Sequence, residues 1–159
     1  MKNGQIQMIG FVLLILSQTA FSQNSTQMAN QTAISVVQQC YSEFGKGNAQ
    51  GVLNLLTDDV SWTDPGYPEI PYAGKRQGKN EVMNFFIEMS KTITFTRFEP
   101  QQFINEGNNV VVKGFFTGKS NATGKTFESE WMMIWAIVDG KVKYYQAFID
   151  THKVVAALK

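Results

Sequence analysis

The sequence predicts an α+β fold in which three N-terminal helices pack on a strongly curved antiparallel sheet. Apolar residues between positions 34 and 89 recur at three- and four-residue steps, which is typical of amphipathic helices. From Ile93 onward the apolar period changes to two, which is typical of strands. The 159 residues, 43% of them hydrophobic and 13% aromatic, are enough for one domain with an apolar core.

Amphipathic stripes predict the three helices. The first helix should end at the glycines of residues 45–47, and Asn48 can cap a second, shorter helix that Asp58-Asp59 closes. Gly78 opens the third. The residues of the three stripes are, in order, Ile34, Val37, Cys40, Tyr41 and Phe44; Val52, Leu53, Leu55 and Leu56; and Val82, Phe85, Phe86 and Met89.

Turn signals delimit the strands. A first strand over residues 60–64 stops at Pro65-Gly66, and the following residues up to Gly78 read as a loop. Three or four long antiparallel strands then follow, separated by turn residues at 107–109, 120–124 and 139–140. Their predicted ranges are 93–105, 110–119, 125–138 and 141–152.

The N-terminal segment predicts export. Residues 1–22 combine Lys2, a nine-residue apolar run over 8–16, and small residues at 20 and 22, which together indicate a secretory signal peptide. The run is shorter than the roughly 20 residues of a membrane-spanning helix, which favours a signal peptide. The alternative to cleavage is an uncleaved anchor. We expect a periplasmic or secreted protein without a membrane span after cleavage, with a flexible arm over 23–31 and the domain over 32–158.

Composition argues against several kinds of partner. Fourteen Lys and Arg residues against thirteen Asp and Glu residues give a net charge of +1, so no basic surface for nucleic acid is expected. The single cysteine, Cys40, excludes an intrachain disulfide framework and a Cys-rich metal site. The single histidine, His152, has no HExxH motif or carboxylate cluster around it. We therefore expect neither a metal nor another cofactor.

The order of the motifs resembles the SnoaL-like, ketosteroid-isomerase-related families of the nuclear transport factor 2-like superfamily. The resemblance covers about residues 32–158 and implies a cone-shaped fold whose mouth leads to a pocket for a small apolar molecule. It does not fix the reaction, because the scaffold hosts isomerases, cyclases, epoxide hydrolases, dehydratases and non-catalytic modules. The matching segments are Gly47-Asn48, Asp58-Asp59-Val60, Trp62-Thr63-Asp64-Pro65, Gly78 before Val82-x-x-Phe85-Phe86, 139–142 and 145–150.

Asp64 is the main catalytic candidate. In the ketosteroid-isomerase-like families, an Asp-Pro at this place supplies the general base, so the resemblance implies that role for Asp64. A carboxylate in an apolar cavity is desolvated, which raises its pKa and makes it a better proton acceptor near neutral pH. The alternative is that Asp64 only begins the turn Asp-Pro-Gly, where Asp is common.

The remaining isomerase machinery matches incompletely. The resemblance implies an oxyanion hole of one Tyr and one protonated Asp, but the Tyr position falls on Cys40 and the Asp position falls near Met133. Tyr41 is a second catalytic candidate, although one residue along a helix is a rotation of about 100°. Ketosteroid isomerisation is therefore disfavoured. Epoxide hydrolysis is disfavoured too, because Ala147 stands where that family needs an aspartate.

Strand alternation, the third helix and the resemblance together predict one pocket, with Asp64 as its only carboxylate. The alternative is a solid hydrophobic core. Lys113 could bind an oxyanion or pair with Asp64, but it also reads as a solvated strand lysine. The predicted lining residues are Trp62, Phe86, Trp131, Met133, Trp135 and Tyr145.

Two functions are compatible with these patterns. One is a SnoaL-like enzyme that uses Asp64 for acid–base chemistry on a small, apolar, carbonyl-containing substrate. The other is a non-catalytic module that binds a hydrophobic ligand or a partner chain. The opposite sheet face is also apolar, which predicts a homodimer through that face. Its residues are Met132, Ile134, Ala136, Tyr144 and Phe148.

Overall fold

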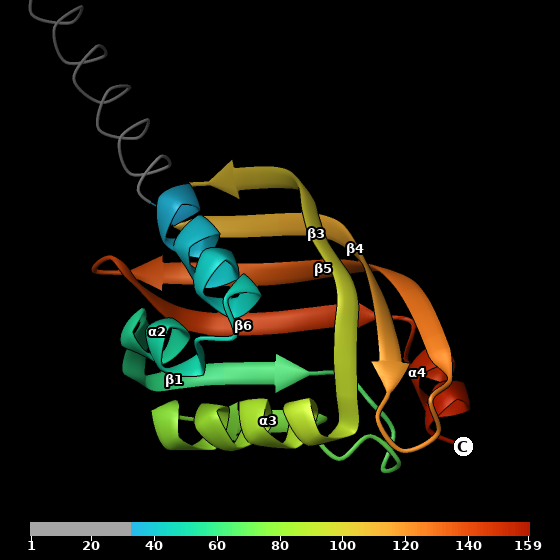
Figure 1. Cartoon of the computed structure of the whole chain (residues 1–159). Helices are drawn as coiled ribbons and strands as arrows, with labels where there is room; N and C mark the ends of the chain where they lie inside the picture. Colours follow the sequence, from blue (N-terminus) through green and yellow to red (C-terminus); the bar gives the residue numbers. More distant parts are fainter. Residues whose placement is uncertain (1–32) are drawn as a thin grey trace, which may run out of the picture.

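A single six-stranded sheet organises the chain, with the strand order β2-β1-β6-β5-β4-β3. The computed structural model describes residues 33–159. The predicted signal peptide (1–22) and arm (23–31) lie outside the described residues. Helices cover the concave face of the sheet (Figure 1), so the predicted α+β class is confirmed.

The part of the chain that the structure describes contains four helices. The first covers residues 33–45, and Asn48 caps the next by accepting a hydrogen bond from the Gly51 amide at 3.0 Å. Gly78 precedes the third helix with a φ of 81°, in the region that favours glycine. The later helices are α2 (Ala49–Asn54), α3 (Lys79–Thr92) and α4 (Thr151–Leu158).

The last four strands form an antiparallel meander, as the sequence predicted. The first strand differs, because it pairs in parallel with the last one and places Trp62 beside Tyr145. The strands are β1 (Leu56–Asp64), β2 (Gly74–Gln77), β3 (Ile93–Glu106), β4 (Asn109–Ser120), β5 (Thr126–Val138) and β6 (Lys141–Ile149).

The first strand begins earlier than predicted. The second helix was expected to include Leu55 and Leu56 and to close at Asp58-Asp59, but α2 ends at Asn54. The amide of Val142 donates to the Leu55 carbonyl at 2.8 Å, and Leu56 pairs with Val142 in the sheet. Pairing with β6 therefore overrides the local helical pattern of these leucines.

Two elements were absent from the prediction. β2 is a short polar edge strand, predicted as loop, that forms by pairing with β1. The second is α4, which replaces the predicted end of the last strand. That strand ends at Ile149 instead of 152, because Asp150 caps α4 by accepting a hydrogen bond from the Lys153 amide at 3.4 Å. The Thr123 hydroxyl donates to the Ala157 carbonyl at 2.6 Å, which attaches α4 to the turn between β4 and β5.

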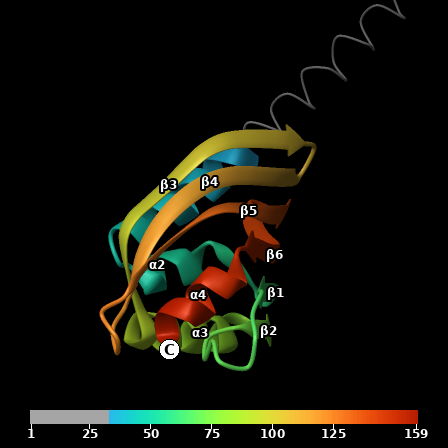
Figure 2. The same ribbon diagram turned by 90° about the vertical axis from the view of Figure 1, so that its right-hand side faces the viewer.

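The sheet curls around its helices, and β3 and β4 arch over them (Figure 2). Register shifts in β3 at Phe95/Arg97 and Pro100/Gln102 mark bulges, which increase the bend of a strand. The core lies on the concave side, where Val37, Leu56 and Val82 are fully buried. Among the described residues, no helix is long and apolar enough to cross a membrane.

Candidate active site

A cavity lies between the concave sheet face and the helices. The volume of this cavity that water-sized molecules can enter is about 60 Å³. It has room for a few waters or part of a small ligand. Among the described residues, Asp64 is the only carboxylate that lines it, and most other lining groups are aromatic or aliphatic. The lining residues are Cys40, Tyr41, Phe44, Val52, Trp62, Asp64, Tyr72, Phe85, Phe86, Met89, Ile93, Phe95, Phe98, Phe116, Met133, Trp135, Tyr145 and Ile149.

Asp64 is the last residue of β1, where Pro65 ends the strand and the β1–β2 ladder still holds the backbone. Its side chain is turned into the cavity wall, and the residue is only 9% exposed. The Trp62 Nε1 donates to Asp64 Oδ2 at 3.0 Å. Within residues 33–159 no donor reaches Oδ1, and that oxygen is not sealed from water-sized molecules. Trp62 therefore binds one carboxylate oxygen, and the other is free to bind a ligand or water in the cavity.

Burial sets the protonation of this carboxyl group. Desolvation raises the pKa of Asp64 to about 7, while the Trp62 hydrogen bond and the charge of Arg76 act in the opposite direction. Both protonation states are consequently populated near neutral pH. A group in that condition can accept a proton and later return it.

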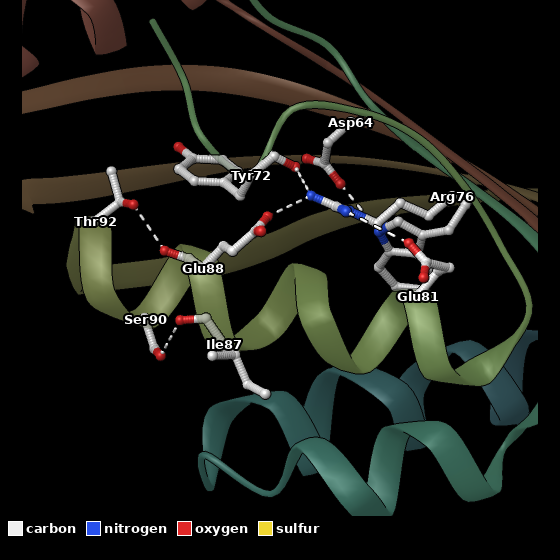
Figure 3. A network of polar contacts seen from close by, with 9 residues as sticks. Asp64, Tyr72, Arg76, Glu81, Ile87, Glu88, Ser90 and Thr92 are labelled. Atoms are coloured by element: carbon white, nitrogen blue, oxygen red, sulfur yellow. Dashed lines mark hydrogen bonds and ion pairs between the residues drawn. The ribbon is translucent and has the colours of Figure 1, made fainter.

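Arg76 is the cation that acts on Asp64 from β2. Its side chain is 13% exposed, and its Nη2 is 2.6 Å from Glu88 Oε2, with Nη1 4.0 Å from Glu81 Oε2 (Figure 3). Nη2 also donates to the Tyr72 carbonyl at 3.3 Å. Two carboxylates of α3 thus share the charge of Arg76, and Asp64 is left without a direct ion pair of its own.

Tyr41 lines the cavity together with Cys40, so the one-residue step along the helix does not turn it away. Its hydroxyl accepts a hydrogen bond from Trp135 Nε1 at 3.1 Å and donates to Met133 Sδ at 3.4 Å. Burial raises the pKa of Tyr41 well above its usual value. This hydroxyl is therefore neutral and already engaged within the protein, and a catalytic role for Tyr41 remains a prediction.

Most of the predicted lining residues meet on this cavity. Trp62 and Tyr145 stack with ring centroids 3.8 Å apart, and Trp135 meets Tyr145 edge-on at 4.7 Å. Phe86 and Met133 complete the predicted set.

Trp131 is the exception and corrects the prediction. It is buried on the predicted face of β5, but it is not among the lining residues. Its ring stacks on Phe98 at 5.1 Å and covers Gly114, where an added Cβ would lie 2.1 Å from Trp131 Cζ2. Strand alternation predicted its face correctly, but the arch of β3 over β5 fills the space in front of it.

Lys113 does not reach the cavity. It lies on the exposed face of β4 and its Nζ is 3.0 Å from Glu130 Oε1. The solvated interpretation of this lysine is therefore correct, and Lys113 does not oppose the raised pKa of Asp64. Within the described part of the chain, no group of three His, Cys, Asp or Glu side chains could hold a metal ion.

Sequence reasoning missed Tyr72. It comes from the loop before β2, is 3% exposed and lines the cavity beside Phe85, with ring centroids 6.0 Å apart. Burial and the nearby Asp64 both raise the pKa of Tyr72. The loop has no periodicity to indicate its inward direction; an aromatic residue between prolines and glycines, shortly after Asp64, was the only available signal.

The family comparison agrees with this geometry. The family model described as a SnoaL-like domain matches residues 37–145, from the first helix to β6. The chain belongs to the SnoaL-like domain family. That range contains Asp64, Tyr41 and every predicted lining residue. No match was found among curated proteins.

Solved structures share the fold of this SnoaL-like chain. An NTF2-like protein from Burkholderia xenovorans LB400 is 28% identical, with a TM-score of 0.75 over 82% of this chain and 98% of that one. An NTF2-like protein from Burkholderia pseudomallei K96243 is 25% identical, with a TM-score of 0.73 over 80% and 98%. TerC, co-crystallised with polyporic acid, is 23% identical, with a TM-score of 0.70 over 80% and 98%, and shows the fold alone.

Proposed function

We propose that this SnoaL-like protein is exported and uses Asp64 as a general base and acid on a small, apolar, carbonyl-containing molecule. One observation carries the catalytic part of the proposal: a nearly buried carboxylate lines an aromatic cavity, and one of its oxygens is open. The aromatic lining suits a flat, apolar substrate. The carboxylate suits a substrate with an acidic C–H bond on the carbon next to a carbonyl group.

The chemical step is a proton transfer. The Asp64 carboxylate removes a proton from the carbon next to the carbonyl, the C–H electron pair becomes a C=C bond, and the carbonyl π pair moves to oxygen. Protonated Asp64 then returns the proton to carbon. Isomerisation, cyclisation and dehydration can all begin with this enolate, so the proposal is a reaction type and not one named substrate.

Deuterium exchange tests the proposal without the natural substrate. Acetophenone and related enolisable aryl ketones are incubated in D2O with the protein, and NMR follows the loss of the α-hydrogens. We expect the wild type to accelerate exchange. The exchange rate with Asp64→Asn should be lower by a factor of about a hundred or more, because general-base catalysis usually contributes at least that factor. The control is Asp139→Asn, an exposed turn position with a φ of 50° that Asn tolerates. Equal rates for Asp64→Asn and the wild type would contradict the proposal.

A second candidate is a non-catalytic binding module. It is favoured by Tyr41, whose hydroxyl is already bonded to Trp135 and Met133, and by Ala147 at the place where an aspartate would act in epoxide hydrolysis. Native mass spectrometry of the exported protein would test it. A small molecule that copurifies, and that binds equally well to Asp64→Asn, would support this candidate over catalysis.

Export and dimerisation are part of the proposal. Cleavage after Ser22 would give a mature protein that begins at Gln23, which N-terminal sequencing detects. Met132 and Phe148 are 42% and 41% exposed and face each other across β5 and β6. Their exposure supports a homodimer through the outer sheet face.

A further inference from the structure

Tyr145 occupies a fixed place between two tryptophans. On β6 it pairs with Trp62 of β1 on one side and with Trp135 of β5 on the other. Its ring stacks on Trp62, with an interplanar angle of 23°, and meets Trp135 at 63°. The ring is 4% exposed, so these contacts leave its hydroxyl little freedom to move.

The same two tryptophans bind two other polar groups of the cavity. Trp62 donates its indole N–H to Asp64, and Trp135 donates its own to Tyr41. Tyr145 therefore contacts the tryptophan that binds Asp64 and the tryptophan that binds Tyr41. All three groups line one cavity.

Unlike Asp64 and Tyr41, the Tyr145 hydroxyl has no hydrogen-bond partner within residues 33–159. No hydrogen bond to it exists among the described residues, and its oxygen is not one of the sealed unpaired atoms. A nearly buried hydroxyl without a partner lowers stability unless a ligand or water satisfies it. Tyr72 is a weaker candidate for the same role, because its hydroxyl points away from the Asp64 carboxylate (Figure 3).

The Tyr145 hydroxyl is a donor. Burial, the charge of Asp64 and the neighbouring Tyr41 all raise the pKa of Tyr145 well above its usual value. It stays protonated at neutral pH, and its O–H can be given to an oxygen that carries negative charge. Such a donor beside a general base fits the oxygen of a carbonyl whose α-carbon faces the base.

We propose that Tyr145 is the hydrogen-bond donor that binds the carbonyl oxygen of the ligand. The inference rests on the proposed function for the carbonyl class of the ligand and adds the residue that recognises it. When Asp64 removes the α-proton, the electron pair that arrives on oxygen is stabilised by the Tyr145 O–H, and both the proton and the pair return when carbon is reprotonated. Tyr145 thus takes the donor role for which the positions of Cys40 and Met133 carry no suitable group.

A pair of probes of the same shape tests this directly. Acetophenone and α-methylstyrene differ only in a C=O group against a C=CH2 group, and titration by ligand-observed NMR measures the affinity of each. We expect the wild type to prefer acetophenone by about tenfold, the usual value of one hydrogen bond. Tyr145→Phe should lose that preference while binding α-methylstyrene as the wild type does. Tyr67→Phe, at a 53% exposed tyrosine, is the matched control and should keep it.

Two further readouts distinguish ligand recognition from a structural role. The carbonyl stretching frequency of bound acetophenone should be lower in the wild type than in Tyr145→Phe, because a hydrogen bond weakens the C=O bond. Tyr145→Phe should unfold at the same or a higher temperature than the wild type, since the removed hydroxyl makes no hydrogen bond to any residue that the structure describes. A wild type without the preference for acetophenone, or a Tyr145→Phe variant that keeps it, would overturn the inference.

Binding and exchange fail separately. If Asp64→Asn exchanges deuterium as fast as the wild type while Tyr145→Phe abolishes the preference, the base assignment is wrong and the donor assignment holds. If Asp64→Asn loses exchange while Tyr145→Phe keeps the preference for acetophenone, the donor assignment is wrong and the base assignment holds.

Discussion

Asp64 reverses the usual relation between a carboxyl group and stability. Most carboxylates are more acidic in the folded state, but burial raises the pKa of Asp64 from its ordinary value of 3.8 to about 7. Between these two values the folded state binds more protons than the unfolded state. The contribution of this group to stability is therefore complete below about pH 4 and is lost as the pH rises through about 7.

The free energy of unfolding should show that dependence. Because one pKa unit corresponds to about 1.4 kcal/mol, the Asp64 contribution should fall by about 2 to 3 kcal/mol between pH 5 and pH 8. Asp64→Asn removes the titration, so its stability should fall less over the same range. Urea unfolding at both pH values measures the difference. Parallel pH dependences for the two proteins would show that Asp64 is not desolvated.

Arg76 should tune the pH at which Asp64 acts. Its guanidinium lowers the pKa of Asp64, so Arg76→Met should move the midpoint of the pH–exchange profile to a higher pH. Arg76→Lys keeps the charge and should move it less. Deuterium exchange across pH 5–9 measures both midpoints, and an unchanged midpoint in Arg76→Met would remove Arg76 from the electrostatics of the site.

At the scale of elements, β4 and β5 pack closely against each other's side chains at Gly114 and Trp131. Trp131 also packs against Tyr41, with ring centroids 5.8 Å apart, in addition to its stack on Phe98. Gly114 permits this packing, because a Cβ there would also lie 2.4 Å from the Glu99 carbonyl oxygen. This part of the sheet is therefore packed solid, while the cavity opens beside it.

Trp131→Ala should behave as a core truncation. We expect a loss of about 3–5 kcal/mol in unfolding free energy, with little change in the relative affinities of the acetophenone and α-methylstyrene probes. Chemical denaturation and the probe titration check both parts. A variant that is nearly as stable as the wild type but has changed probe selectivity would show that Trp131 lines the cavity after all.

The elements that the sequence predicted are those whose pattern is local. The first helix, α3 and the strands β4 to β6 each bury one continuous face. Their apolar residues therefore recur at the period of a helix or a strand, and the sequence shows that period directly. β2 has no such pattern, since it forms only because the edge of β1 is available. The end of β6 depends on the Asp150 cap, whereas Ile149 and Thr151, both β-branched, continue the alternation of a strand.

The site follows the same division. Asp64, Trp135 and Tyr145 could be predicted, because strand alternation indicates the direction of Trp135 and the family resemblance indicates that of Asp64 and Tyr145. Phe95 and Phe98 could not, since the bulge at Phe95/Arg97 changes which side chains of β3 face inward. Tyr72 enters from a loop. The solid packing around Trp131 results from the arch of β3, which no single strand contains.

For the whole molecule, the outer sheet face determines the predicted assembly. We expect a homodimer at micromolar concentration, and Phe148→Glu should dissociate it, because burying an unpaired charge in an apolar interface is unfavourable. Sedimentation measures both species, with Ile87→Glu as a control at an exposed apolar residue of α3, 42% exposed and outside that face. A wild-type monomer at that concentration would contradict the dimer.

The central claim for the molecule as a whole is that its fold encloses Asp64 in an apolar cavity and keeps it partly protonated at neutral pH. NMR of protein labelled with ¹³C at the aspartate carboxyl carbons measures this most directly, and the signal that disappears in Asp64→Asn identifies the residue. The structure predicts a titration midpoint near pH 7 for that signal. A midpoint near the ordinary aspartate value of 3.8 would contradict the claim.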